Sequence, residues 1–162
     1  MDRAIAELHD HTIVCGYGRV GRHLAATLHR DRSPFVVVDN DEDKLDELAE
    51  QGFLRVRGDA TEEHVLAEAG IARASAVVAS VNSDADNVLV TLTAKGMRPG
   101  CVVIARVKAD ENERKLQRAG ADRDREQRHG CEERVHRARR ERHADKGGEN
   151  DERHHARLQQ GE

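Results

Sequence analysis

Short apolar runs alternate with amphipathic stretches along the first 122 residues of the chain. The runs are rich in β-branched residues and mostly continuous, which is typical of strands buried on both faces of a parallel sheet. They predict five strands, at 11–15, 35–38, 53–57, 76–80 and 101–105.

The intervening stretches carry helical spacing, such as Val20, Leu24 and Leu28 at i, i+4 and i+8. We expect Thr61 to cap the third helix and Val88, Leu89 and Leu92 to face inward on the fourth. The five helices are predicted at 19–29, 42–51, 62–69, 83–96 and 111–118. This alternation predicts an α/β protein, a Rossmann-like doubly wound parallel β-sheet with helices on both faces.

A G-x-G-x-x-G sequence joins the first strand to the first helix, where a dinucleotide-binding loop is expected. Its first glycine would permit a tight turn, its second the approach of a pyrophosphate, and its third the packing of the helix. Free N–H groups at the helix start would stabilise phosphate, and the arginine would add a charged contact unless it is merely solvated. The candidate loop residues are Gly16, Tyr17, Gly18, Arg19, Val20 and Gly21.

Asp39 follows the second strand, 18 residues after Gly21. A carboxylate there accepts hydrogen bonds from a ribose and repels a 2′-phosphate, which favours NAD or an adenine nucleotide such as ATP or ADP over NADP. Asp59 ends the third strand at the same edge, although it would also serve simply to cap the next helix. The remaining candidates at this edge are Asn40, Ala60 and Ser80.

Composition changes abruptly at residue 123. Charged residues make up 36% of the chain, against about 25% in ordinary globular proteins. In 123–162, 21 of 40 residues are charged, and Val135 and Leu158 are the only large aliphatics. So little apolar surface cannot offset the entropy of ordering. We expect a lead-in over 1–10, a folded domain over 11–122 and a charged, disordered tail.

Charge and cysteine content exclude several classes. The first 122 residues hold 16 basic and 21 acidic residues, so nucleic-acid binding is not expected. Three cysteines without C-x-x-C spacing suggest neither a disulfide framework nor a metal site. Without a signal peptide or an apolar run of about 18 residues, the chain is expected to be cytoplasmic and not itself inserted in a membrane.

A reaction centre is not visible in the sequence. A dehydrogenase needs a substrate domain that supplies a general acid or base, and none follows the nucleotide-binding pattern. Of the ten histidines, five lie in the tail and the others are scattered. We therefore predict a binding module with no catalytic residue.

Four ordered motifs together resemble the RCK domain, the regulator of potassium conductance also called the Trk N-terminal domain. The resemblance covers about residues 8–122, and its motifs are Cys15–Gly21, Val38-Asp39, Gly58–Thr61 and Gly120–Asp122. It implies a regulatory domain that senses NAD(H), ATP/ADP or a cation and gates potassium transport. Its partner would be a channel pore or a Trk/Ktr membrane subunit, at the cytoplasmic face of the inner membrane.

The resemblance also implies residue roles and an assembly. Gly16, Gly18, Arg19 and Gly21 would hold phosphates, Asp39 the ribose and Asp59 the adenosine side. The domain would form a homodimer or a ring of eight lobes, with lobe-to-lobe contacts that partly involve Leu89, Val90 and Leu92. Residues 5–11 resemble the segment that joins a pore helix to this domain, so we interpret Met1 as either an internal start or an artificially chosen start within a channel subunit.

The chain departs from the family pattern in two places. Arg106 and Lys108 stand where calcium-gated members carry acidic residues, so calcium binding there is not expected. The tail replaces an expected sixth strand. It is either a natural disordered segment or an out-of-frame end of the gene, and the abruptness of the change favours the second.

Two other functions stay open at this stage. The chain could be the cofactor-binding half of an NAD-dependent oxidoreductase, or an assembly module that has lost its ligand. The residues do not distinguish NAD(H) from ATP/ADP, because Asp39 suits the ribose of either.

Overall fold

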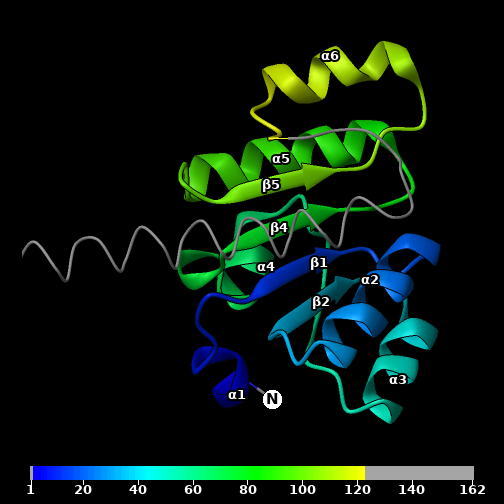
Figure 1. Cartoon of the computed structure of the whole chain (residues 1–162), viewed down its shortest axis with the longest axis vertical. Coiled ribbons are helices and arrows are strands. Elements are labelled where there is room, and N and C mark those ends of the chain that lie inside the picture. The colour runs from blue at the N-terminus through cyan, green and yellow to red at the C-terminus, as the bar shows by residue number, and fades with distance from the viewer. Residues whose placement is uncertain (1, 123–162) are drawn as a thin grey trace, which may run out of the picture.

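All five predicted strands form one parallel sheet in the order β3-β2-β1-β4-β5 (Figure 1). The computed structural model describes residues 2–122. In the central pairings, Cys15 lies opposite Val38 on one side and Ala79 on the other. The strands are β1 (Thr12–Cys15), β2 (Phe35–Asp39), β3 (Arg55–Arg57), β4 (Ala76–Ala79) and β5 (Val102–Ala105). The predicted α/β class and Rossmann-like sheet are confirmed.

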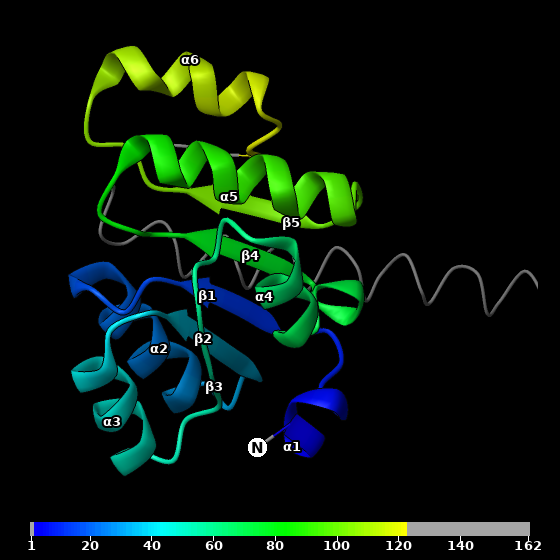
Figure 2. The same ribbon diagram turned by 180° about the vertical axis from the view of Figure 1, so that it is seen from behind.

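Helices cover both faces of this sheet. The elements are α1 (Asp2–Ala6), α2 (Arg19–Arg30), α3 (Glu42–Glu50), α4 (Glu63–Glu68), the 3₁₀ turn η1 (Ile71–Arg73), α5 (Asp84–Met97) and α6 (Asp110–Arg118). Helices α2 and α3 share one core cluster, and α1, α4 and α5 share the other. Figure 2 shows α4 and α5 in front of the strands, with α6 against α5 at the top.

Alternate strand residues supply the two cores. Val14, Val37 and Val78 pack under α2 and α3, whereas Ile13 and Val36 face α4 and α5. All five are at most 2% exposed. Burial of such a side chain contributes about 1.5–3 kcal/mol, so the continuous apolar runs are explained by packing on both faces.

The segment before α4 differs from its prediction. Thr61 does not cap this helix, because Glu62 occupies the N-cap position and makes no side-chain capping bond. The Thr61 hydroxyl donates instead to Asp59 Oδ1 at 2.7 Å, which closes a turn after β3. Glu62, which the pattern had assigned to the helix, is therefore its N-cap, and α4 begins at Glu63.

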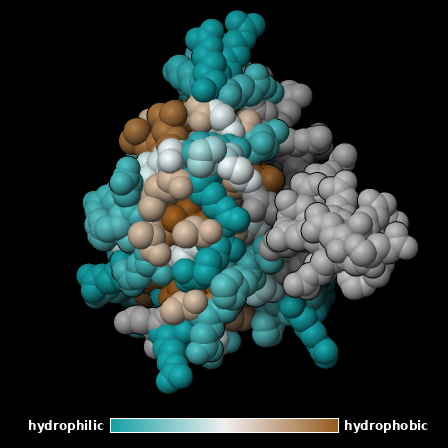
Figure 3. Space-filling view, turned by 90° about the vertical axis from the view of Figure 1, so that its left-hand side faces the viewer, coloured by the Kyte–Doolittle hydropathy of each residue, from teal (hydrophilic) through white to brown (hydrophobic). Residues whose placement is uncertain are grey.

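Helix α5 buries only part of the face that its sequence predicts: Val88 packs against the core as expected, but the two leucines do not. Leu89 and Leu92 are each 49% exposed, and the buried positions include Asn87, Val90 and Thr91. The polar members of this inward face bond to backbone oxygens, so a face of low hydrophobicity is buried at little cost. Val90 belongs to the core and cannot take part in the lobe-to-lobe contact implied for it. In Figure 3 hydrophobic atoms form separate patches on a mostly hydrophilic face.

Both ends of the described chain are held against the domain by burial or hydrogen bonds. Ile5 of α1 is 2% exposed, and Arg73 donates to the carbonyl oxygens of Leu8 at 3.1 Å and Ile5 at 3.3 Å. At the other end, the Asp122 amide donates to the Val103 carbonyl at the outer edge of β5, at 2.8 Å. The predicted tail, 123–162, lies outside the described residues.

Candidate functional site

The glycine loop follows β1, which lies beside β4 at the point where the strand order of the sheet reverses. Gly16 has a φ of +95°, and a Cβ there would meet the Ser80 carbonyl oxygen at 3.0 Å. A Cβ at Gly21 would lie 1.9 Å from the Gly16 oxygen, so α2 approaches the turn as closely as a glycine permits. Ser80 Oγ donates to the carbonyls of Cys15 and Gly16 at 3.0 and 3.2 Å. These contacts fix the loop.

Gly18 differs from the other two glycines. It stands at the N-cap of α2 with a φ of −82°, and a Cβ there would meet no protein atom within 4 Å. No internal packing therefore requires this glycine. Its missing side chain leaves open space over the helix N-terminus, where backbone N–H groups stabilise an anion.

Asp39 sits at the end of β2 and is 7% exposed. Its Oδ2 accepts from the Tyr17 amide at 2.6 Å, and its Oδ1 accepts from the Asp41 amide at 3.0 Å. Lys44 Nζ lies 3.4 Å from Oδ1 and 3.5 Å from Oδ2. The carboxylate thus ties the glycine loop to the start of α3 and keeps acceptor capacity for a ligand.

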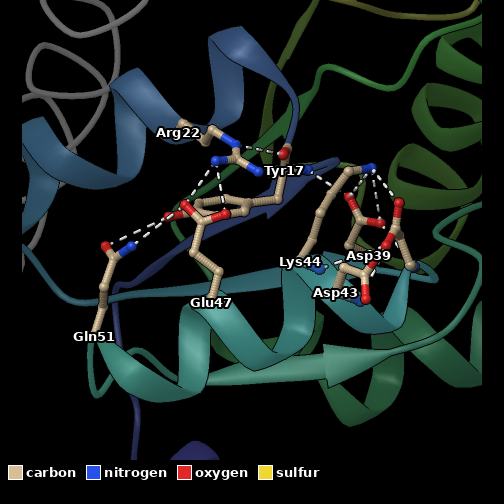
Figure 4. Close-up of polar contacts among 8 residues, drawn as sticks. Tyr17, Arg22, Asp39, Asp43, Lys44, Glu47 and Gln51 are labelled. Atoms are coloured by element: carbon tan, nitrogen blue, oxygen red, sulfur yellow. Dashed lines mark hydrogen bonds and ion pairs between the residues drawn. The ribbon is translucent and has the colours of Figure 1, made fainter.

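The Tyr17 side chain points away from this carboxylate and packs between α2 and α3 (Figure 4). The Arg22 guanidinium carbon lies 5.0 Å from the centre of its ring and Arg22 pairs with Glu47 at 2.6 Å. The Tyr17 hydroxyl reaches Gln51 Oε1 at 3.5 Å. Burial, followed by the charge of Glu47, raises the pKa of the tyrosine. The ring is therefore an anchor of the loop, and the backbone amide is its contribution to the site.

An open cavity of about 240 Å³ joins these features at the carboxyl edge of the sheet. It is somewhat smaller than the roughly 300–1,000 Å³ of pockets that enclose a small molecule, so an extended ligand would lie partly in solvent. Seven of the eleven predicted site residues line it: Gly16, Gly18, Asp39, Asn40, Asp59, Ala60 and Ser80.

The other four predicted residues lie beside the cavity and do not line it. Gly21 and the Tyr17 ring support the loop from behind. Val20 is half-buried in the first turn of α2, and Arg19 is exposed on that turn. Asp59 is exposed and accepts from the Thr61 amide at 2.9 Å, so it closes a turn as well as facing the cavity.

Several lining residues were not predicted. The wall is completed by seven further residues: Val38, Lys44, Gly58, Thr61, Val81, Asn82 and Asp86. Lys44 had a sequence signal, since a lysine in the first turn opposes the helix dipole and needs a local anion. The residues after β4 had a weaker sequence signal, which is only that β4 ends at the same edge of the sheet.

Other kinds of site are not seen in residues 2–122. This part of the chain contains no cluster of three or more potential metal ligands. None of its helices has the length and apolarity needed to span a bilayer.

Comparison with known proteins gives the family. A family model described as the TrkA-N domain matches residues 12–123. The chain belongs to the TrkA-N domain family. The resemblance to the RCK, or Trk N-terminal, domain is thereby confirmed, and the TrkA-N match covers all five strands of the sheet.

Two relatives of this TrkA-N domain come from Methanocaldococcus jannaschii. Potassium channel protein 1 is 40% identical over 125 residues, and Probable potassium channel protein 2 is 44% identical over 128 residues. Each match covers 76% of this chain and 37% of the relative. The chain therefore spans little more than a third of the length of these relatives.

Solved structures share the fold. The TrkA-N domain of the Escherichia coli inner membrane protein ybaL matches with a TM-score of 0.70 and 26% identity, over 73% of this chain and 87% of that one. The GsuK channel bound to NAD matches with a TM-score of 0.67 and 33% identity, over 73% of this chain and 21% of that one. GsuK bound to ADP matches with a TM-score of 0.66 and 33% identity, over 73% of this chain and 31% of that one.

Proposed function

We propose that this TrkA-N domain is a nucleotide-sensing regulatory domain that controls potassium transport through a membrane partner. The observation that carries the proposal is the cavity at the topological switch point, where an open Gly18 and the carboxylate of Asp39 converge. The transported ion is proposed to be potassium because two relatives are named as potassium channel proteins.

The proposed ligand is NAD(H) or ATP/ADP. GsuK structures hold NAD and ADP, which share an adenosine and a diphosphate. In this chain Gly18 would let a diphosphate approach the start of α2, and Asp39 would accept from the ribose. Asn40, Asp59, Ala60 and Ser80 would complete the contacts.

The proposed role is non-catalytic. Among the described residues that line the cavity there is no histidine or cysteine. Burial raises the pKa of the nearby Cys15 thiol to about 12, so it stays protonated and unreactive. A site that binds without reacting suits a sensor, whose ligand shifts a conformational equilibrium. The potassium channel names of the relatives also favour this role over the cofactor-binding half of an oxidoreductase.

The proposed partner is a channel pore or a Trk/Ktr membrane subunit, which would place the domain at the cytoplasmic face of the inner membrane. Self-association into a homodimer or a ring of eight lobes would use the exposed Leu89 and Leu92 of α5. The anchored α1 offers a firm connection to a preceding pore segment.

The test is titration of the purified chain with NADH, ATP and ADP, by calorimetry. Gly18→Ala should weaken binding by about tenfold or more, because its methyl group occupies the space that a diphosphate needs. Its melting temperature should fall by no more than a few degrees, since the new Cβ meets no protein atom. Gly100→Ala, at an equally open glycine before β5, is the matched control and should bind as the wild type does.

The outcomes separate the candidate functions. Absence of binding by the wild type, with self-association intact, would identify an assembly module. Oxidation of NADH with any added substrate would identify an oxidoreductase. In liposomes that hold this domain together with its membrane partner, nucleotide should change potassium flux, and Gly18→Ala should abolish that response.

A further inference from the structure

Lys44 aims its ammonium at the residue that defines ribose recognition. Its Nζ lies 3.4 Å from Asp39 Oδ1, 3.5 Å from Asp39 Oδ2 and 3.4 Å from Asp41 Oδ2 (Figure 4). The side chain is 26% exposed and lines the cavity. It is the single basic side chain among the described residues of that wall, which also holds Asp39, Asp59 and Asp86.

This position is not one that helix stability favours for a lysine. Lys44 is the third residue of α3, and its own amide donates to the capping carboxylate of Asp41. A cation in the first turn opposes the helix dipole and is unfavourable there. The preceding residues, Glu42 and Asp43, follow the ordinary acidic preference. Contact with Asp39 and Asp41 offsets the cost and holds the ammonium at the cavity wall.

The contacts of Asp39 show which side remains for a ligand. Backbone amides of Tyr17 and Asp41 occupy one acceptor position on each carboxylate oxygen. Lys44 lies against both oxygens and lines the cavity. A ribose that approaches Asp39 from the cavity therefore meets an ammonium together with the carboxylate.

We propose that Lys44 determines ribose specificity, so that the site accepts the 2′-phosphorylated dinucleotide NADP(H) as well as NAD(H). The inference rests on the proposed nucleotide-binding function. Asp39 alone would repel a 2′-phosphate, but Lys44, which is shared with Asp41, brings a positive charge to within 3.5 Å of both Asp39 oxygens. A 2′-phosphate would gain a charge-assisted contact with the ammonium, and an unmodified 2′-hydroxyl would still have Asp39 as its acceptor.

The test compares NADH and NADPH on the purified chain at low ionic strength. The wild type should bind the two with dissociation constants within about tenfold of each other. Lys44→Met keeps the length of the side chain and removes its charge. It should therefore weaken the binding of NADPH by about tenfold or more and that of NADH by less than about threefold. Lys44→Arg should preserve the ratio of the two constants. Lys115→Met, at an exposed lysine of α6, should change neither constant.

Two results would overturn the inference: a wild-type preference for NADH above about a hundredfold, or a ratio that Lys44→Met leaves unchanged. If Lys44→Met fails to fold, Lys44→Gln serves as a second neutral variant, and a ratio that it leaves unchanged overturns the inference equally. Strong discrimination with firm NADH binding refutes the role of Lys44 and leaves the proposed function standing. Binding of neither nucleotide refutes both.

Discussion

His11 illustrates how a single buried residue couples the fold to pH. It precedes β1, is fully buried, and its Nε2 donates to the Ala69 carbonyl at 2.9 Å. Burial lowers the pKa of this imidazole, and the nearby charges of Arg73, Arg98 and His9 lower it further, against the opposing effect of the Ala69 bond. The folded state therefore favours the neutral imidazole of His11.

The free energy of unfolding should fall as pH drops below the unfolded histidine pKa of about 6.5, because there the unfolded state binds a proton that the folded state excludes. His11→Gln keeps a donor for Ala69 and removes the titration, so its stability should depend less on pH. Urea unfolding of both proteins between pH of about 7.5 and 5.5 measures the difference. The exposed His23→Gln is the control, and equal pH slopes for wild type and His11→Gln would contradict the prediction.

Some residues of the candidate site could be predicted from the sequence and others could not. Gly16, Gly21 and Asp39 were predictable because backbone geometry leaves few alternatives at a turn between strand and helix. Lys44 was missed because its role depends on where α3 points its first turn. Hydrophobic periodicity locates the helix without fixing that direction.

At the scale of elements, the first turns of α5 join two loops of the site edge. The Asn87 side chain accepts from the Val81 amide at 3.0 Å and donates to the carbonyls of Val81 and Arg106, at 3.2 and 3.0 Å. Asp84 accepts from the amides of Lys108 and Ala109, at 3.0 and 3.1 Å. The loop that lines the cavity and the loop that leads to α6 are thus fixed to one helix.

Asn87→Ala should lower the free energy of unfolding by about 2–4 kcal/mol, because it removes three hydrogen bonds to part-buried backbone groups of Val81 and Arg106. Urea unfolding followed by circular dichroism measures the change. Asn40→Ala, at an exposed position of the same edge, should change stability by less than about 0.5 kcal/mol. A loss at Asn87 no larger than at Asn40 would show that the loops do not depend on this side chain.

These bonds also explain why part of the face of α5 was predicted wrongly. A pattern based on hydrophobicity places Leu89 and Leu92 inward, because it counts asparagine and threonine as solvent-facing. Asn87 and Thr91 can be buried because each side chain donates a hydrogen bond to a backbone carbonyl oxygen. Thr91 bonds within its own helix, to the carbonyl of Asn87, whereas the partners of Asn87 are in place only once the two loops have come together in three dimensions.

At the scale of the whole molecule, the sheet was predictable and its surroundings were less so. Continuous apolar strands at regular intervals admit few arrangements other than a parallel sheet with helices on both faces. The N-terminal lead-in proved to be packed into the core through Ile5. A helix of five residues is too short for its hydrophobic pattern to show in advance which side chain will be buried.

Replacement of both Leu89 and Leu92 by aspartate should reduce self-association, because two exposed large apolar side chains on one helix favour burial against another surface. Light scattering should show a smaller mass for this double variant than for the wild type. Its melting temperature should stay within a few degrees, since both side chains are half exposed. Ala26→Asp, on the exposed side of α2, is the control. An unchanged mass would exclude this surface of α5 from the assembly.

The grip of Arg73 on α1 has a mechanical consequence. Tension applied at the N-terminal end would load the two bonds from Arg73 to Ile5 and Leu8 before it reaches the pairing of β1 with its neighbours. Behind them, the Asp10 amide bonds to the Arg73 carbonyl at 2.9 Å, so the same residue holds the next link as well. Arg73 therefore acts as a clamp in series with the sheet, and the strength of that clamp limits the force that α1 can transmit before it peels away.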